Sequence, residues 1–224
     1  MRQILPYYRV AECAALYAGV PLLLTCLAPP GLLIPILWVV GTAVFGVLAR
    51  MPGVELRRLH HVRIPGRQLG WIVARWLLAC IALTLLLYLL RPALLFRLPV
   101  QQPRLWLLVM LLYPVISVYP QTLIYRALFE ARYATLFHSA HVSLLVGACL
   151  FSLAHLPFQN LWALALTLPG GYLFLSTYRS TGSIVLSAVE HALYGNALFT
   201  IGWGAYLYSG SVQMTHTLLT AVGP

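Results

Sequence analysis

Apolar residues run along this chain in long stretches that short polar connections separate. A helix needs roughly 20 mostly apolar residues to cross the hydrocarbon core of a bilayer. The pattern therefore predicts an all-α, polytopic integral membrane bundle of about seven or eight transmembrane helices, built as a single domain over residues 1–224. The predicted spans are 10–28, 32–49, 71–90, 105–129, 142–155, 161–178 and 184–199, followed by a shorter stretch that reaches about residue 208.

The composition excludes a water-facing globule. Hydrophobic residues make up 61% of the chain and charged residues only 8%, far from the balance of soluble domains. The net charge of +10 comes entirely from arginine, because the sequence contains no lysine. Most of the arginines lie between the apolar stretches, and they form no basic stripe with interleaved aromatic residues, so no nucleic acid partner is expected. The lipid bilayer is the expected surrounding.

The arginines also predict how the chain is oriented. Basic residues are enriched in the cytoplasmic loops of membrane proteins. The connection between the second and third spans is the richest in arginine, so we expect it and the N-terminus to face the cytoplasm of a bacterial inner or plasma membrane. The arginines expected on this side are Arg2, Arg9, Arg50, Arg57, Arg58, Arg63, Arg67, Arg132 and Arg179, and those expected opposite are Arg91, Arg97 and Arg104.

Three polar clusters interrupt spans that are otherwise apolar. Ionisable side chains inside a bilayer are costly and mark functional sites by default. Because the clusters lie on successive helices of one small chain, we expect them to face a shared polar chamber. Their members are Gln121, Thr122 and Arg126 in the first, Phe151 and His155 in the second, and Glu190, His191 and Asn196 in the third.

The spacing predicts how the first two clusters meet. If the chain turns back near His138, Gln121 and His155 lie equally far from the turn, about 25 Å along two antiparallel helices. Glu130 follows Arg126 by four residues, so an ion pair along the same helix face is expected.

Prolines and cysteines within the spans have structural interpretations. Pro114 and Pro120 are expected to break or kink the fourth span, because proline removes a helical hydrogen bond. The four cysteines show no CxxC spacing, so we expect small buried hydrophobes, with neither a disulfide nor a metal site. They are Cys13, Cys26, Cys80 and Cys149.

The clustered side chains suit chemistry on a peptide bond. His155 can act as a general base or acid near neutral pH, and His191 with Asn196 can donate hydrogen bonds to an oxyanion. Arg126 can hold a carboxylate. Structural alternatives are an arginine that reaches toward headgroups, an interfacial histidine bonded to a carbonyl, and a Glu190–His191 pair that holds two helices together.

The clusters resemble the motifs of the CPBP family of intramembrane proteases, which includes type II CAAX prenyl endopeptidases and bacteriocin-processing or immunity-type relatives. That family carries Glu-Glu-x-x-x-Arg, Phe-x-x-x-His and His-x-x-x-Asn on successive membrane helices. The segment YPQTLIYRALF matches the first motif through Arg126, and FSLAHLPF matches the second through Phe151 and His155. The segment EHALYGNALF matches the third through His191. The resemblance covers about residues 105–208.

The resemblance implies an intramembrane endopeptidase that cleaves a membrane-embedded or lipid-anchored peptide and needs no metal or other cofactor. In the family, the first glutamate and the histidine of the second motif activate a water molecule, which implies that role for His155. His191 and the nearest asparagine, Asn196, would stabilise the oxyanion. Arg126 would orient the glutamate pair.

Two departures from the family pattern bear on activity. Gln121 and Thr122 replace the glutamates, and loss of a general base commonly costs on the order of 10²–10⁴ in rate. Gly195 occupies the asparagine position, so Asn196 needs a local π-bulge at Gly195 to face the same way. The alternatives are a pseudoprotease that binds membrane peptides in immunity or assembly, and a small permease-like component whose polar chamber passes a solute or proton.

Overall fold

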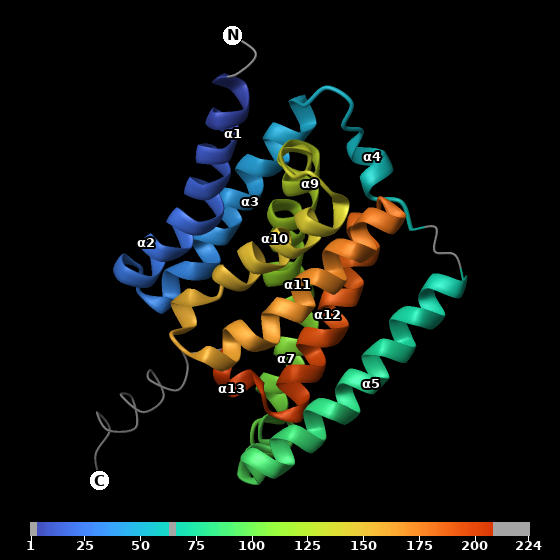
Figure 1. Cartoon of the computed structure of the whole chain (residues 1–224). Helices are drawn as coiled ribbons and strands as arrows, with labels where there is room; N and C mark the ends of the chain where they lie inside the picture. The colour runs from blue at the N-terminus through green and yellow to red at the C-terminus, as the bar shows by residue number, and fades with distance from the viewer. Residues whose placement is uncertain (1–3, 63–65, 208–224) are drawn as a thin grey trace.

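The computed structural model describes residues 4–62 and 66–207, and every regular element within them is helical. The helices form a bundle with α5 along its outside (Figure 1). The α-helices are α1 (Ile4–Ala14), α2 (Val20–Leu27), α3 (Leu33–Arg50), α4 (Leu56–Leu59), α5 (Gly66–Leu90), α6 (Arg97–Gln101), α7 (Pro103–Tyr113), α8 (Tyr119–Thr122), α9 (Phe129–Arg132), α10 (Ala140–Leu153), α11 (Leu161–Thr181), α12 (Ile184–Ile201) and α13 (Gly204–Leu207).

Several of these helices continue into one another without a loop. A π-helical turn, η1 (Ala15–Gly19), joins α1 to α2, and two more, η4 (Pro114–Val118) and η5 (Leu123–Leu128), join α7, α8 and α9. Shorter 3₁₀ turns occur at connections and helix ends. They are η2 (Pro30–Leu32), η3 (Pro92–Leu94), η6 (Ala134–Leu136) and η7 (Leu156–Phe158).

The described residues contain six helices that are long and apolar enough to cross a membrane. A seventh, α11, has 21 residues and is long enough at about 1.5 Å per residue, but glycines, threonines and Arg179 make it less apolar. The predicted all-α membrane bundle is confirmed, but six of the described helices qualify as spans where seven or eight were predicted. Of the predicted eighth stretch only α13 is described, and the rest lies outside the described residues. The six are Tyr7–Leu27, Leu33–Arg50, Gly66–Leu90, Pro103–Arg132, Ala140–Phe158 and Ile184–Ile201.

The fourth span is not broken at its prolines. It is helical from Pro103 to Arg132 and contains the two π-helical stretches η4 and η5. Proline lacks the N–H group of a regular helical bond, and η4 begins at Pro114, where that bond is missing. Pro120 packs against Gly41 of α3, where an added Cβ would lie 2.8 Å from the proline Cβ. The prolines therefore change the helical register of the span and allow α3 to approach it closely.

A glycine allows α10 and α11 to pack closely against each other. An added Cβ at Gly171 would lie 2.9 Å from Phe151 Cδ1 and 3.0 Å from Ala148 Cα. Lipid offers no hydrophobic driving force between helices, so close van der Waals packing of this kind holds them together. At the fourth span, the hydroxyl of buried Tyr17 donates to the Ile124 carbonyl at 2.7 Å.

The two ends of the bundle carry different connections. Arg132 forms a bidentate ion pair with Glu12 of α1, and Ser183 donates to the His61 carbonyl at 2.6 Å. These bonds gather α1, the arginine-rich second connection and the α11–α12 turn at one end, near α4 and α9 in Figure 1. The 91–102 connection lies at the other end, because Phe96 N–H donates to the Ile201 carbonyl. This relative grouping agrees with the arginine pattern, although Arg2 and Arg63 lie outside the described residues.

The prediction that all four cysteines are buried is wrong. Cys13 is buried against the core, Cys80 is half-buried, and Cys26 and Cys149 are exposed on the bundle surface. A thiol is apolar enough to face lipid as well as protein, so apolar spans alone do not determine which side it takes. None of the four forms a disulfide.

Candidate functional site

Phe151 on α10 is the ring around which the polar residues of the spans gather. His155 follows it by one helical turn, its ring centroid lies 4.9 Å away, and its Nδ1 bonds the Phe151 carbonyl at 2.9 Å. A carbonyl can only accept, so Nδ1 carries the hydrogen and Nε2 of the neutral ring is the basic nitrogen. The helix ends just before His155 at Leu153, and Pro157 prevents its continuation.

His191 reaches the same phenyl ring from α12. Its centroid lies 5.4 Å from that of Phe151, and its ring stacks on Phe174 of α11 at 4.6 Å. The side chain is only 5% exposed, and Nε2 lies 3.2 Å from the hydroxyl of Tyr113. The structure therefore brings His155 and His191, from separate spans, against one aromatic ring in T-shaped contacts.

Arg126 lies over the face of that ring. Its guanidinium carbon is 4.0 Å from the Phe151 centroid and 5.4 Å from the Phe174 centroid, and the side chain is 0% exposed. This depth rules out an arginine that reaches toward headgroups. A cation that stacks on aromatic faces away from water gains about 2 kcal/mol or more, which offsets part of the cost of its burial.

The predicted ion pair between Arg126 and Glu130 is wrong. Glu130 accepts instead from Nε of Arg179 on α11 at 2.7 Å. The reason is local: residues 123–128 are π-helical, and a π-helix takes more residues per turn than an α-helix. A separation of four residues therefore no longer places the two side chains on the same face.

Gln121 and Thr122 bond within their own helix. Gln121 Nε2 donates to Ser117 Oγ at 2.8 Å, and Thr122 Oγ1 donates to the Val118 carbonyl at 2.9 Å. The turn before α10 falls near His138, as predicted, with Ser139 capping the helix.

The Glu190–His191 pair offered as a structural alternative is also wrong. Glu190 is 0% exposed and binds Nη2 of Arg75 on α5, with 2.5 Å between the charged atoms. Arg75 also donates to Thr177 Oγ1 at 2.6 Å. Neighbouring helical residues point roughly 100° apart, so Glu190 faces α5 while His191 faces Phe151. Neither Arg75 nor Thr177 was among the residues singled out from the sequence.

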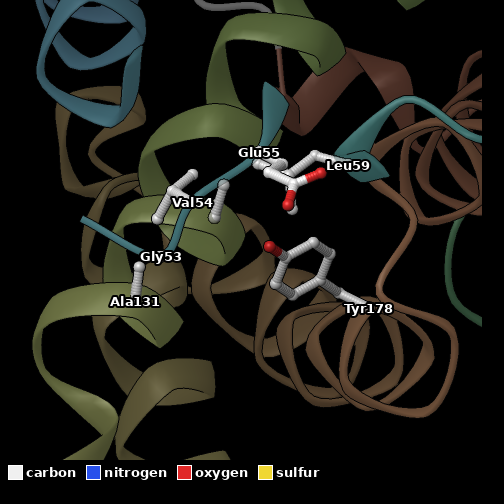
Figure 2. A pocket seen from close by; sticks show the side chains of 7 residues that line it. Gly53, Val54, Glu55, Leu59, Ala131 and Tyr178 are labelled. Atoms are coloured by element: carbon white, nitrogen blue, oxygen red, sulfur yellow. The ribbon is translucent and has the colours of Figure 1, made fainter. Parts of the chain in front are cut away.

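All four glutamates of the chain lie within the described residues, and three of them are held by arginines from other elements: Glu12 by Arg132, Glu130 by Arg179 and Glu190 by Arg75. Glu55 lines a pocket of about 160 Å³, in which its carboxylate faces the hydroxyl of Tyr178 (Figure 2). A second pocket of about 390 Å³ lies near the C-terminal end of α5 and is lined by Leu87, Leu90, Arg91, Trp162, Trp203 and Tyr206. Neither pocket is lined by the residues around Phe151.

Asn196 does not turn toward His191. Its Nδ2 donates to the Met110 carbonyl of α7 at 3.3 Å. The π-bulge that would rotate it does not form, since α12 is α-helical from Ile184 to Ile201. At Gly195 an added Cβ would overlap the ring and hydroxyl of Tyr113.

Tyr113 is the member of this cluster that sequence reasoning missed. The available signal was the spacing of four residues that places Tyr113, Ser117 and Gln121 on one side of the fourth span. Within the described part of the chain, no group of three or more His, Cys, Asp or Glu side chains is arranged to hold a metal ion.

The fold and this buried cluster define a polytopic membrane protein with an arginine and two histidines from three spans around one phenyl ring. The model of the Rce1-like family, type II CAAX prenyl endopeptidases, matches residues 103–198. The predicted resemblance to the CPBP family of intramembrane proteases is confirmed, and the matched region contains all three motifs. Over these residues the chain is similar to CAAX-type intramembrane proteases. No curated protein and no solved structure matches the chain.

Proposed function

We propose that this protein is an intramembrane endopeptidase of the CAAX-protease type, which cleaves a membrane-embedded or lipid-anchored peptide. The observation that carries the proposal is the convergence of His155 and His191 on Phe151, with Arg126 over the same ring. Polar side chains within membrane spans cost free energy, and here they come from three different spans. Their arrangement suits acid–base chemistry better than helix packing alone.

In the proposed mechanism His155 is the general base. Its Nε2 accepts a proton from water as the water oxygen bonds to the peptide carbonyl carbon, and the carbonyl electron pair moves onto oxygen. Collapse of this tetrahedral intermediate breaks the C–N bond, and the imidazolium returns its proton to the departing nitrogen. The products are a new carboxylate and a new amine. The hydrogen bond from Nδ1 to the Phe151 carbonyl fixes the tautomer that this step needs.

Two further side chains stabilise the negative charge that develops on the substrate oxygen. His191 donates a hydrogen bond from Nε2, and the buried Arg126 guanidinium supplies a positive charge where water does not screen it. Because Gln121 and Thr122 offer no carboxylate, His155 works without the acidic partner that the resemblance implies. The expected turnover is correspondingly slow.

The test is cleavage in reconstituted liposomes by the whole chain, followed by mass spectrometry. One substrate is a farnesylated CAAX peptide, and the other is an unprenylated transmembrane peptide. The proposal is supported if the wild type cleaves either peptide and if His155→Ala and His191→Ala each abolish this cleavage. Thermal unfolding of the two variants should stay unchanged. His138→Ala serves as the matched control, since His138 is exposed in the turn before α10. Cleavage that persists in His155→Ala removes that residue from the mechanism.

A pseudoprotease that binds such peptides without cutting them is the second candidate. The observation that favours it is the bonding of Gln121 and Thr122 within their own helix, with no glutamate beside His155. Saturable peptide binding by the wild-type protein, with no cleavage product after prolonged incubation, supports this candidate over the first.

We further propose that the arginine-rich end of the bundle faces the cytoplasm. The support is the grouping of the second connection, the start of α1 and Arg132 at one end. Single cysteines that replace Arg57 and Arg97 in a cysteine-free background test this with a membrane-impermeant maleimide. Labelling of intact cells at position 97 alone supports the orientation, and labelling at position 57 alone reverses it.

A further inference from the structure

Tyr113 is fixed against the same face of α12 that carries His191. The tyrosine ends α7, directly before the π-helical stretch that begins at Pro114. Its ring meets the imidazole edge-on at an interplanar angle of 89° and packs against Phe199 at 5.4 Å. Its hydroxyl lies 3.2 Å from His191 Nε2. The phenol is therefore held from both sides, with its polar end on the histidine.

Gly195 makes this position possible. It follows His191 by four residues, so both lie on one face of the helix. A Cβ at position 195 would overlap the Tyr113 ring and hydroxyl, so the phenol fills the space that a side chain at this position would take. The Tyr113 hydroxyl therefore occupies the place beside His191 that a side chain at position 195 would otherwise take.

Asn196 cannot serve the same purpose in this arrangement. Its amide nitrogen donates to the Met110 carbonyl, and the unbroken α-helix keeps its side chain on a different face from that of His191. The polar group that does contact His191 is the Tyr113 hydroxyl.

We propose that Tyr113 is a catalytic residue that donates a hydrogen bond to the oxyanion beside His191. The inference rests on the proposed endopeptidase function. His191 Nε2–H and the phenolic O–H lie side by side, with 3.2 Å between their heavy atoms, so both donate to the charged substrate oxygen. That oxygen carries enough lone pairs to accept both hydrogen bonds at the same time.

The first experiment compares Tyr113→Phe with Asn196→Ala in the liposome cleavage assay. Removal of one oxyanion donor lowers kcat by about 10²–10³-fold, and this loss is expected for Tyr113→Phe with KM nearly unchanged. Tyr172→Phe is the matched control, because its ring contacts His141 at the other end of α10. A Tyr113→Phe variant that keeps the wild-type kcat overturns the proposal, as does a larger loss for Asn196→Ala.

The second experiment exchanges the donor between helices. Gly195→Asn alone is expected to lower stability, because the new side chain overlaps Tyr113. Tyr113→Ala clears that space, so the double variant Tyr113→Ala/Gly195→Asn is expected to recover at least tenfold in kcat over Tyr113→Ala. No recovery in a double variant that folds and binds peptide contradicts the shared position.

A third measurement separates this inference from the proposed function. A peptide phosphinate mimics the tetrahedral intermediate and is not cleaved, so its affinity reports the oxyanion donors even when turnover is too slow to detect. The wild type is expected to bind the phosphinate more tightly than the matched amide, and Tyr113→Phe is expected to lose this preference while it keeps amide affinity. A wild type without the preference overturns the role of Tyr113. Absence of any peptide binding or cleavage counts against the proposed function itself.

Discussion

The guanidinium carbon of Arg126 lies 4.0 Å from the centroid of Phe151, and both side chains are almost wholly buried. The same phenyl ring makes T-shaped contacts with both His155 and His191. One aromatic side chain on α10 thus contacts polar groups from three spans. Its face stabilises the cation, and the two imidazoles pack against the same ring.

Replacement of this ring is expected to disturb all three contacts together. Phe151→Ala removes packing in the bundle interior, and a change of this kind costs about 3–5 kcal/mol in protein cores, in addition to the lost contact with Arg126. Thermal unfolding in detergent measures the effect. Phe158→Ala is the control, because Phe158 is half-buried and also touches His155. Equal losses in the two variants would contradict the central position of Phe151.

The ion pair between Arg75 and Glu190 gives a second prediction, because Glu190 is fully buried while Arg75 is 30% exposed. Removing the arginine leaves an uncompensated buried carboxylate, at a cost of up to about 3–5 kcal/mol, whereas replacing both partners with apolar residues is often nearly neutral. Arg75→Leu is expected to lower the unfolding temperature strongly, and Arg75→Leu/Glu190→Leu is expected to recover most of it.

The pair between Arg132 and Glu12 offers a comparison, because both of its side chains are partly exposed. Arg132→Leu is expected to cost about 1 kcal/mol or less. For the Arg75–Glu190 pair, equal losses of unfolding temperature in Arg75→Leu and Arg75→Leu/Glu190→Leu would show that the two charges are not energetically coupled.

Close packing at Gly171 gives a third prediction. Gly171→Ala places a Cβ within about 3 Å of Phe151 and of the α10 backbone, so α10 and α11 must move apart and the protein is expected to be destabilised by about 1–3 kcal/mol. Gly70→Ala on α5 is the matched control, because nothing lies within 4 Å of its Cβ position. There the gain in helix propensity is expected to leave the unfolding temperature unchanged or slightly raised.

A fourth prediction concerns the missing carboxylate. Gln121→Glu keeps the size of the side chain and places an acid one turn from Ser117, so the cleavage rate is expected to rise by as much as 10²–10⁴-fold. Gln121→Met, similar in size but without charge, controls for packing. The gain should vanish when His155→Ala is added. A rise that survives in that background would show that the acid acts independently of His155.

The sequence by itself determined the solvent, the helical class and the positions of the six apolar helices that are long enough to cross a membrane. Apolar length and the cost of unpaired backbone groups in lipid leave few other structures for such a chain. It also placed Arg126, His155 and His191 in the right spans, because polar residues in apolar surroundings stand out.

Only the tertiary structure decided which side chains meet. The π-helical stretch after Thr122 moved Glu130 away from Arg126 and toward Arg179, although a spacing of four residues had predicted a pair. Side-chain direction on a helix depends on the local number of residues per turn, and sequence periodicity assumes one value throughout.

The contact between Tyr113 and His191 was likewise decided by the tertiary structure. Tyr113 lies 78 positions before His191 in the chain, and local spacing relates it only to Ser117 and Gln121 of its own span. It meets the histidine because glycine at position 195 leaves room for a ring from another helix. The sequence records which residues are costly to bury, while contact between distant residues is fixed by helix packing, which places them side by side in space.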